Sequence, residues 1–163
     1  TLNIFIMKKV GRLRLSELEG RMDTLTKAEQ HEYLGGNNTW RIYGGYLYEV
    51  EGGTLFCGDN GKFVWFPGIS VSSDWVTGGA AYQYGGTIHV DEDWSNFDIN
   101  DFAHEYGHYL QQKDKGYWSY ILNVAIPSMY TAGSDPENHS TYWYEQDATQ
   151  RGEHVLYDQG YYY

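Results

Sequence analysis

Between residues 37 and 90, short runs of β-branched and aromatic residues alternate with turn sequences. The four clearest runs span residues 40–43, 46–50, 62–66 and 87–90. They are separated by Gly-Gly, Asp-Asn-Gly and Pro-Gly sequences, which are typical of turns. Asp59-Asn60-Gly61, directly before one run, predicts a β-hairpin. This part of the chain is therefore expected to form β-structure.

After these runs, apolar and polar residues recur with the spacing of a helix, which predicts a helix from about residue 101 to residue 112 or 113. Asp98 or Asn100 is expected to cap its N-terminus. Apolar side chains form one stripe along this helix, and polar side chains form another: Asp101, His104, Glu105, His108 and Gln112. Gly107 lies inside the helix at a cost of about 1 kcal/mol relative to alanine. Close approach by another backbone would offset that cost.

Two more helices are predicted towards the C-terminus. Residues 117–130 are apolar and are expected to be helical up to a break at Pro127. A last helix is expected to start near Ser140 or Thr141, after a turn at residues 133–136. Its residues Glu145, Ala148 and Gly152 share one face, and the tyrosine-rich tail after it is expected to be a short closing or frayed segment.

The first 36 residues differ in composition from the rest of the chain. They carry six basic and five acidic side chains, whereas the remaining residues carry five basic and seventeen acidic ones. A helix-forming stretch over residues 16–34 ends abruptly at Gly35-Gly36, which a glycine C-cap alone would explain. Within it, Leu25-Thr26-x-x-Glu29 followed by Tyr33-Leu34-Gly35-Gly36 resembles the double-glycine leader peptides of bacterial secreted peptides and proteins. The resemblance implies a leader over residues 1–36, a peptidase-containing export transporter as its partner, and a secreted domain over residues 37–163.

Charge and hydropathy exclude other classes of protein. The formal net charge of −11 argues against a nucleic-acid partner, because binding phosphates requires clustered lysine and arginine. No apolar run is long enough to span a bilayer. The single cysteine, Cys57, cannot form an intramolecular disulfide and is expected to pack in a strand.

The predicted helix over residues 101–113 contains the most informative motif, His104-Glu105-Tyr106-Gly107-His108. Residues four apart lie on the same helical face, so both imidazoles could bind one Zn²⁺ ion. Glu105 lies beside the first histidine, where its carboxylate could act as the general base for a metal-activated water.

A catalytic zinc site needs a third protein ligand. The position six residues after His108 is Asp114, so a third histidine in the metzincin arrangement is absent. Glu145 on the last helix is the preferred candidate, with its small neighbours packing near Gly107. His139 is the alternative, either as the third ligand or as a catalytic group that stabilises the oxyanion. Asp147, two residues from Glu145, is expected to point away from the metal.

Taken together, the sequences HEYGHYLQ, Ile126-Pro127-Ser128, His139 and WYEQDA resemble a group of small bacterial zincin-like metallopeptidase domains. The resemblance covers about residues 85–155. It implies an α+β zincin-like fold, with a twisted, mainly antiparallel sheet packed on the motif helix and a second ligand-bearing helix. It carries over His104, His108 and Glu145 as Zn²⁺ ligands and Glu105 as base, and it places a substrate-binding edge strand at residues 85–90.

One position departs from the gluzincin pattern, because Thr149 stands where an aspartate often orients a ligand histidine. A hydrogen-bond acceptor for each ligand histidine is still expected, and Asp101, one turn before His104, could serve. The sequence thus predicts a zinc metallopeptidase that hydrolyses peptides or proteins outside the cytoplasm. The alternative is a secreted zincin-fold binding module or bacteriocin-like effector whose metal is structural or absent.

Overall fold

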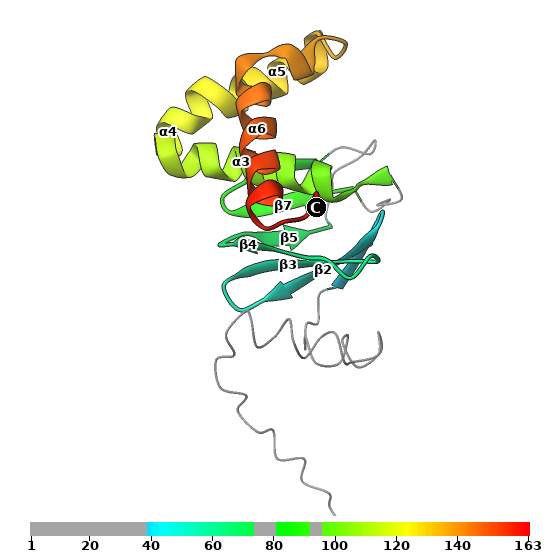
Figure 1. Ribbon diagram of the computed structural model, residues 1–163. Helices are drawn as coiled ribbons and strands as arrows, with labels where there is room; N and C mark the ends of the chain where they lie inside the picture. The colour runs from blue at the N-terminus through cyan, green and yellow to red at the C-terminus, as the bar shows by residue number, and fades with distance from the viewer. Residues whose placement is uncertain (1–38, 74–80, 92–95) are drawn as a thin grey trace, which may run out of the picture. The chain divides into compact units, whose positions relative to one another are not determined.

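The computed structural model describes residues 39–73, 81–91 and 96–163. The predicted leader over residues 1–36 lies outside these residues. The described part has an α+β fold in which the strands come first and the helices follow. In Figure 1 the helices lie together on one side of the strands.

The first four strands form an antiparallel meander. They are β1 (Thr39–Ile42), β2 (Gly45–Val50), β3 (Gly53–Gly58) and β4 (Phe63–Pro67), in the sheet order β1-β2-β3-β4. The predicted hairpin turn at Asp59-Asn60-Gly61 joins β3 to β4, and Gly61 has a φ of 81°, which favours glycine. Leu47, Phe56 and Phe66 from these strands are fully buried and begin the hydrophobic core.

A second sheet is formed by β5 (Ser70–Ser72), β6 (Ala81–Tyr84) and β7 (Thr87–Val90), in the order β5-β7-β6. The prediction that residues 85–90 form a free edge strand is wrong. β7 is the central strand, parallel to β5 and antiparallel to β6. Gly85 and Gly86, with φ of 62° and 87°, form the hairpin turn between β6 and β7 instead of extending a strand.

Helix α3 (Ile99–Lys115) contains the histidine motif and begins where the sequence predicts. Asp98 is its N-cap, and its side chain accepts hydrogen bonds from the backbone of Asn100 and Asp101, while Asp101 returns a hydrogen bond to the Asp98 N–H. The apolar face packs on β4, with the rings of Phe66 and Phe102 4.8 Å apart. The opposite face of α3 is therefore left for the polar side chains.

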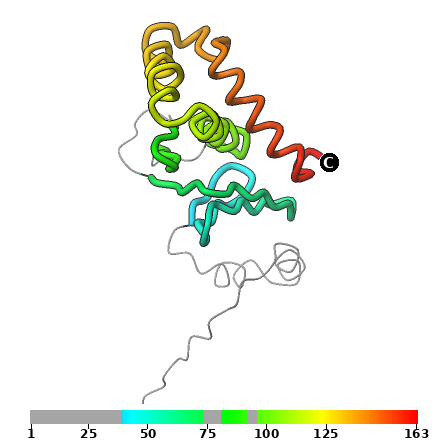
Figure 2. Tube along the Cα trace, turned by 90° about the vertical axis from the view of Figure 1, so that its left-hand side faces the viewer, coloured from blue at the N-terminus to red at the C-terminus, as the bar shows by residue number. Residues whose placement is uncertain are grey.

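The chain then leaves α3 through a continuous helical segment and returns as another helix. The segment consists of α4 (Tyr117–Tyr120), the π-helix η2 (Ile121–Ala125) and α5 (Ile126–Ser134). After the 3₁₀ turn η3 (His139–Thr141), α6 (Trp143–Asp158) runs back beside α3. Figure 2 shows this path, with α6 leading back to the C-terminus next to the strands.

Pro127 does not break the helix, contrary to the sequence-based prediction. A proline ring clashes with the carbonyl four residues earlier in an α-helix. Here the preceding turn is a π-helix, in which the Ile126 N–H donates to the Ile121 carbonyl. The wider turn accommodates the ring, so the helix continues as α5 with Pro127 in its first turn.

Candidate metal centre

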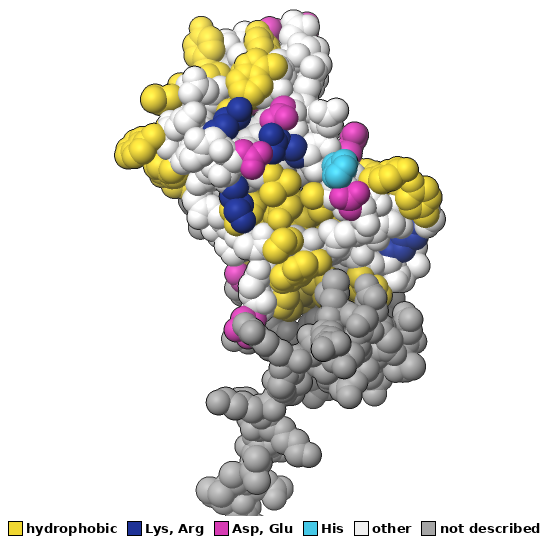
Figure 3. Space-filling view, turned by 60° about the vertical axis from the view of Figure 1, so that its left-hand side comes forward, with side chains coloured by type: hydrophobic (Ala, Val, Ile, Leu, Met, Phe, Trp, Pro, Cys, Tyr) yellow, Lys and Arg dark blue, Asp and Glu magenta, His cyan; other side chains and the backbone are white. Residues whose placement is uncertain are grey.

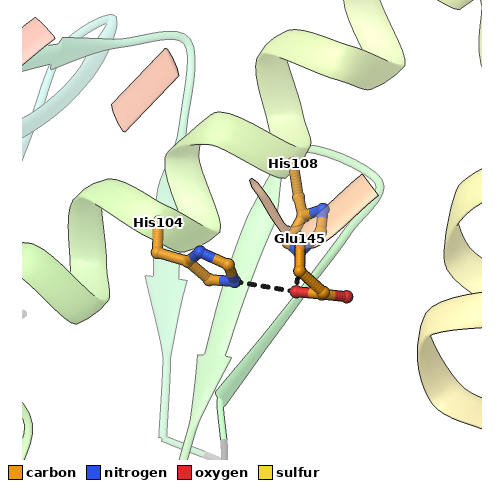
Figure 4. A group of neighbouring side chains, drawn as sticks. All are labelled: His104, His108 and Glu145. Atoms are coloured by element: carbon orange, nitrogen blue, oxygen red, sulfur yellow. Dashed lines mark hydrogen bonds and ion pairs between the residues drawn. The ribbon is translucent and has the colours of Figure 1, made fainter. Parts of the chain in front are cut away.

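Helix α3 presents His104 and His108 on the same side, one turn apart. Their rings are 4.9 Å apart between centroids and are nearly perpendicular. Figure 4 shows both side chains pointing towards Glu145, which lies in the first turn of α6. The packing of the two helices thus brings Glu145 next to His104 and His108, which lie 41 and 37 positions earlier in the chain.

The three side chains meet at one carboxylate oxygen. The Glu145 Oε2 atom lies 3.1 Å from Nε2 of His104 and 3.2 Å from Nε2 of His108. One ligand atom from each residue lies within 4.8 Å of the others. The side chain of Glu145 is 3% exposed and that of His108 is 8% exposed, whereas His104 is 28% exposed and leaves the group open on one side. These residues form a possible metal-binding triad.

Two glycines allow the backbones of α3 and α6 to approach. A Cβ on Gly107 would lie 1.9 Å from the Ala148 carbonyl oxygen, and one on Gly152 would lie 2.1 Å from the Ala103 carbonyl oxygen. Any side chain at either position would push the helices apart. The predicted packing of the small residues of α6 near Gly107 is confirmed, and it sets the distance between Glu145 and the histidines.

A buried glutamine fixes the protonation of His108. Gln111 is fully buried, and its Nε2 atom donates to the Tyr144 carbonyl at 2.7 Å and to Asp147 Oδ2 at 2.8 Å. With its amide held this way, the Gln111 Oε1 atom accepts from Nδ1 of His108 at 2.9 Å. The Nδ1 atom therefore carries a proton, which leaves the Nε2 atom facing Glu145; this nitrogen donates to the carboxylate when the ring is protonated and offers a lone pair to a metal when the ring is neutral.

His104 is oriented by Thr149, whose Oγ1 atom lies 2.9 Å from its Nδ1 atom. The prediction that Asp101 does this is wrong, because the Asp101 carboxylate accepts the backbone N–H of Asp98 in the helix cap. Thr149 is four residues after Glu145, so its side chain emerges one turn further along the same face. It thus lies on the side of α6 that faces His104 and contacts the histidine.

The three groups also shift one another's pKa values. Burial raises the pKa of Glu145, but the hydrogen bonds from His104 and His108 outweigh burial and hold the pKa well below its usual range. Burial lowers the pKa of His108, and the hydrogen bond to Glu145 together with the charge of Glu105 raises it overall. The site therefore favours negative charge on Glu145 and positive charge beside it.

Glu105 lies next to this group on α3 and is 8% exposed. Within the described residues, no hydrogen-bond donor contacts its carboxylate. Burial raises the pKa of Glu105, while the charges of His108 and His104 act in the opposite direction. A buried carboxyl group with a raised pKa and no fixed partner is suited to accepting and releasing a proton.

His139 lies behind Glu145 and outside the group of three. Its Nε2 atom is 3.5 Å from the other carboxylate oxygen, Glu145 Oε1, which is buried and has no hydrogen-bond partner. The Nδ1 atom of His139 is 2.9 Å from Thr131 Oγ1, which also contacts the Tyr144 hydroxyl at 2.8 Å. The structure thus brings Glu145, and not His139, between the two histidines of α3.

Three residues near the triad were not predicted to have a role there. They are Gln111 and Thr149, which contact the two histidines, and Tyr120. Tyr120 is 3% exposed, and its pKa is raised far above its usual value by burial and by the negative charges of Glu105 and Glu145. Gln111 could have been found, since it lies three residues after His108 and so shares its face. Asp147 points away from the triad, as expected, and holds Gln111 instead.

Comparison with protein-family models, curated proteins and solved structures found no match to this chain.

Proposed function

We propose that this protein is a zinc-dependent metallopeptidase with a zincin-like fold. One observation carries the proposal: two imidazole nitrogens and one carboxylate oxygen converge within 4.8 Å, beside a second buried glutamate. Two histidines and one glutamate are a known donor set for catalytic zinc with three protein ligands. We therefore assign His104, His108 and Glu145 as the ligands.

The contacts around the triad suit a cation. The Nε2 atom of His108 and the Glu145 carboxylate lie 3.2 Å apart, where either a shared proton or a bound cation satisfies both atoms. The other carboxylate oxygen, Glu145 Oε1, is buried and lies 3.5 Å from Nε2 of His139. Gln111 and Thr149 hold the far side of each imidazole, as partners of ligand histidines generally do.

A zinc ion held by His104, His108 and Glu145 would supply Lewis-acid polarisation of a peptide carbonyl and a lowered pKa for bound water. Glu105 takes the proton from the attacking water and delivers it to the leaving amine. Its raised pKa makes the carboxyl group able to hold that proton between the two steps. His139, whose Nε2 atom lies 3.5 Å from Glu145, and the buried Tyr120 are candidate donors to the oxyanion.

The outer strand β6, and not residues 85–90, is the proposed edge for an extended peptide substrate. β6 lies alongside α3, and the Gln83 side-chain amide donates a hydrogen bond to the Gln112 side chain at 3.0 Å. The hydroxyl groups of Tyr84 and Tyr117 are hydrogen-bonded at 2.6 Å. Addition of a peptide strand at a sheet edge supplies main-chain hydrogen bonds without a sequence requirement. A peptide there would run past the motif helix.

The test combines metal content with cleavage of a peptide library. We expect one zinc per chain, cleavage by the wild type, and no cleavage by Glu105→Gln, which should retain zinc. Glu145→Ala should lose zinc, whereas Glu153→Gln, an exposed acid on the same helix, should retain both zinc and activity. Zinc binding with no cleavage by any variant would instead favour the binding module or effector, and zinc bound equally by Glu145→Ala would remove Glu145 as a ligand.

We further propose that residues 1–36 act as an export leader and that the domain over residues 37–163 is secreted. Support comes from Gly35-Gly36 and from the change in composition there. The secreted form should begin at Asn37-Asn38-Thr39 when its N-terminus is sequenced. An intact N-terminus outside the cell would disprove the leader.

A further inference from the structure

The helical segment over residues 117–134 has two apolar faces, and only one of them is buried. Tyr120, Val124 and Thr131 lie on the inner face and are at most 8% exposed. The outer face carries five apolar side chains, which we call the outer stripe: Trp118 (74% exposed), Leu122 (65%), Ile126 (54%), Met129 (75%) and Tyr130 (72%). Exposed apolar side chains that gather on one face of a helix commonly mark an interaction surface. The outer stripe lacks a partner within the described residues.

The outer stripe differs in kind from the other exposed apolar positions. Across the described residues, the large aliphatic side chains that are exposed are Leu122, Ile126 and Met129, and the other exposed large apolar side chains are aromatic. Residues 116–134 contain no charged side chain, although 20% of the whole chain is charged. Figure 3 shows apolar side chains projecting from the end of the molecule that α4 and α5 form in Figure 1.

We propose that the outer stripe inserts into the surface of a lipid bilayer. A helical ridge that combines aliphatic residues with tryptophan and tyrosine, and that carries no charge, matches the boundary between headgroups and acyl chains. No helix of the described part is long and apolar enough to cross a membrane. The segment therefore lies in the interface.

The area of the stripe favours a bilayer over a second copy of the chain. Its five side chains expose on the order of 600 Å² in total, from the usual sizes of such side chains. A ridge that packs against a flat protein surface buries only part of this exposed area. A stable protein interface buries about 800 Å² on each partner, so the stripe is too small for one. Lipid surrounds a convex ridge on its sides and can cover all of the stripe.

The charge of the protein predicts which lipids it prefers. A chain with a net charge of −11 is repelled by anionic membranes, so apolar insertion and not charge must drive binding. Neutral phosphatidylcholine vesicles should therefore bind at least as well as vesicles that contain phosphatidylserine. Added salt should not weaken binding to the neutral vesicles. This proposal does not depend on the metal site.

The experiment is flotation of the full chain with phosphatidylcholine vesicles. The wild type should float with the vesicles, and Leu122→Asp/Met129→Asp should partition at least about tenfold less, because the added charges must leave water. The matched control is Tyr43→Asp/Tyr157→Asp, which adds the same charge at exposed aromatic positions elsewhere and should bind like the wild type. Circular dichroism establishes that each variant is folded.

A second variant tests insertion directly. Brominated lipids quench nearby tryptophan, so Trp118→Phe should bind but should lose most of the quenching seen with the wild type. Failure of the wild type to float, or equal loss in both double variants, would overturn the proposal. A dimer of the wild type that Leu122→Asp/Met129→Asp abolishes, with no flotation, would instead assign the stripe to a second copy.

Discussion

Gly107 of α3 lies so close to Ala148 of α6 that a Cβ on the glycine would stand 1.9 Å from the alanine carbonyl oxygen. This contact fixes how near Glu145 comes to the two histidines, because Ala148 and Glu145 are neighbouring positions on one face of α6. The absence of a side chain at Gly107 therefore allows the close helix packing that positions the triad, although glycine is unfavourable within its own helix.

Gly107→Ala is accordingly expected to destabilise the protein despite its better helix propensity. Separating two packed helices costs about 3 kcal/mol, against about 1 kcal/mol gained from propensity. Zinc affinity should fall at least about tenfold, since Glu145 moves away from the histidines. Urea denaturation and competition with a chromogenic chelator measure the two effects.

The matched control is Gly133→Ala in α5, where no atom lies within 4 Å of the added Cβ. That variant should be as stable as the wild type, or up to about 1 kcal/mol more stable, with unchanged zinc affinity. If both glycine variants behaved alike, the close approach would not be what sets the site.

Thr149→Val should lower zinc affinity by about tenfold or more without unfolding the protein. Valine has the same shape but cannot bond to the Nδ1 atom of His104, which Thr149 contacts at 2.9 Å. Thr149→Ser keeps the hydroxyl and should stay within about threefold of the wild type. Thr149 is exposed, so melting temperatures should be similar in all three proteins. Equal affinities for the valine and serine variants would show that His104 does not need this partner.

Gln111→Leu should be more damaging, because Gln111 is buried and bonds to His108, Asp147 and the Tyr144 carbonyl at once. Leaving these groups unpaired costs on the order of 2 kcal/mol, and loss of the fixed His108 orientation should weaken zinc binding. Its neighbour provides the control: Gln112→Leu removes only the bond to Gln83 and should leave zinc affinity unchanged. A loss of affinity shared by both variants would point to a general disturbance of α3.

The parts of the site that follow from one helix could be predicted from the sequence. The spacing of His104 and His108, the cap at Asp98 and the packing of Gly107 each depend on local geometry or residue size, and the structure agrees with these predictions. Glu145 could be proposed because its small neighbours lie on the same helical face.

The predictions that were wrong concern contacts between segments that are distant in the sequence. The choice between Thr149 and Asp101 as partner of His104 depends on how α6 is rotated against α3. A free edge at residues 85–90 was wrong because two short strands that the sequence does not mark, β5 and β6, pair with β7 on either side. A break at Pro127 was wrong because a π-turn absorbs the proline.

The last prediction concerns alkaline pH and Cys57, which packs in β3 as the sequence predicts. Burial raises the pKa of the Cys57 thiol from 9.0 to about 12, so the folded protein keeps the proton while the unfolded chain releases it. The contribution of the thiol to stability is therefore complete below pH 9 and is lost as the pH rises from about 9 to about 12. Cys57→Ala should show a shallower fall in the free energy of unfolding over this range, by roughly 3 kcal/mol in total. Urea denaturation at a series of pH values measures the two slopes. Tyr106, whose pKa burial also raises to about 12, supplies a fall common to both proteins, so parallel curves would contradict the assignment to the thiol.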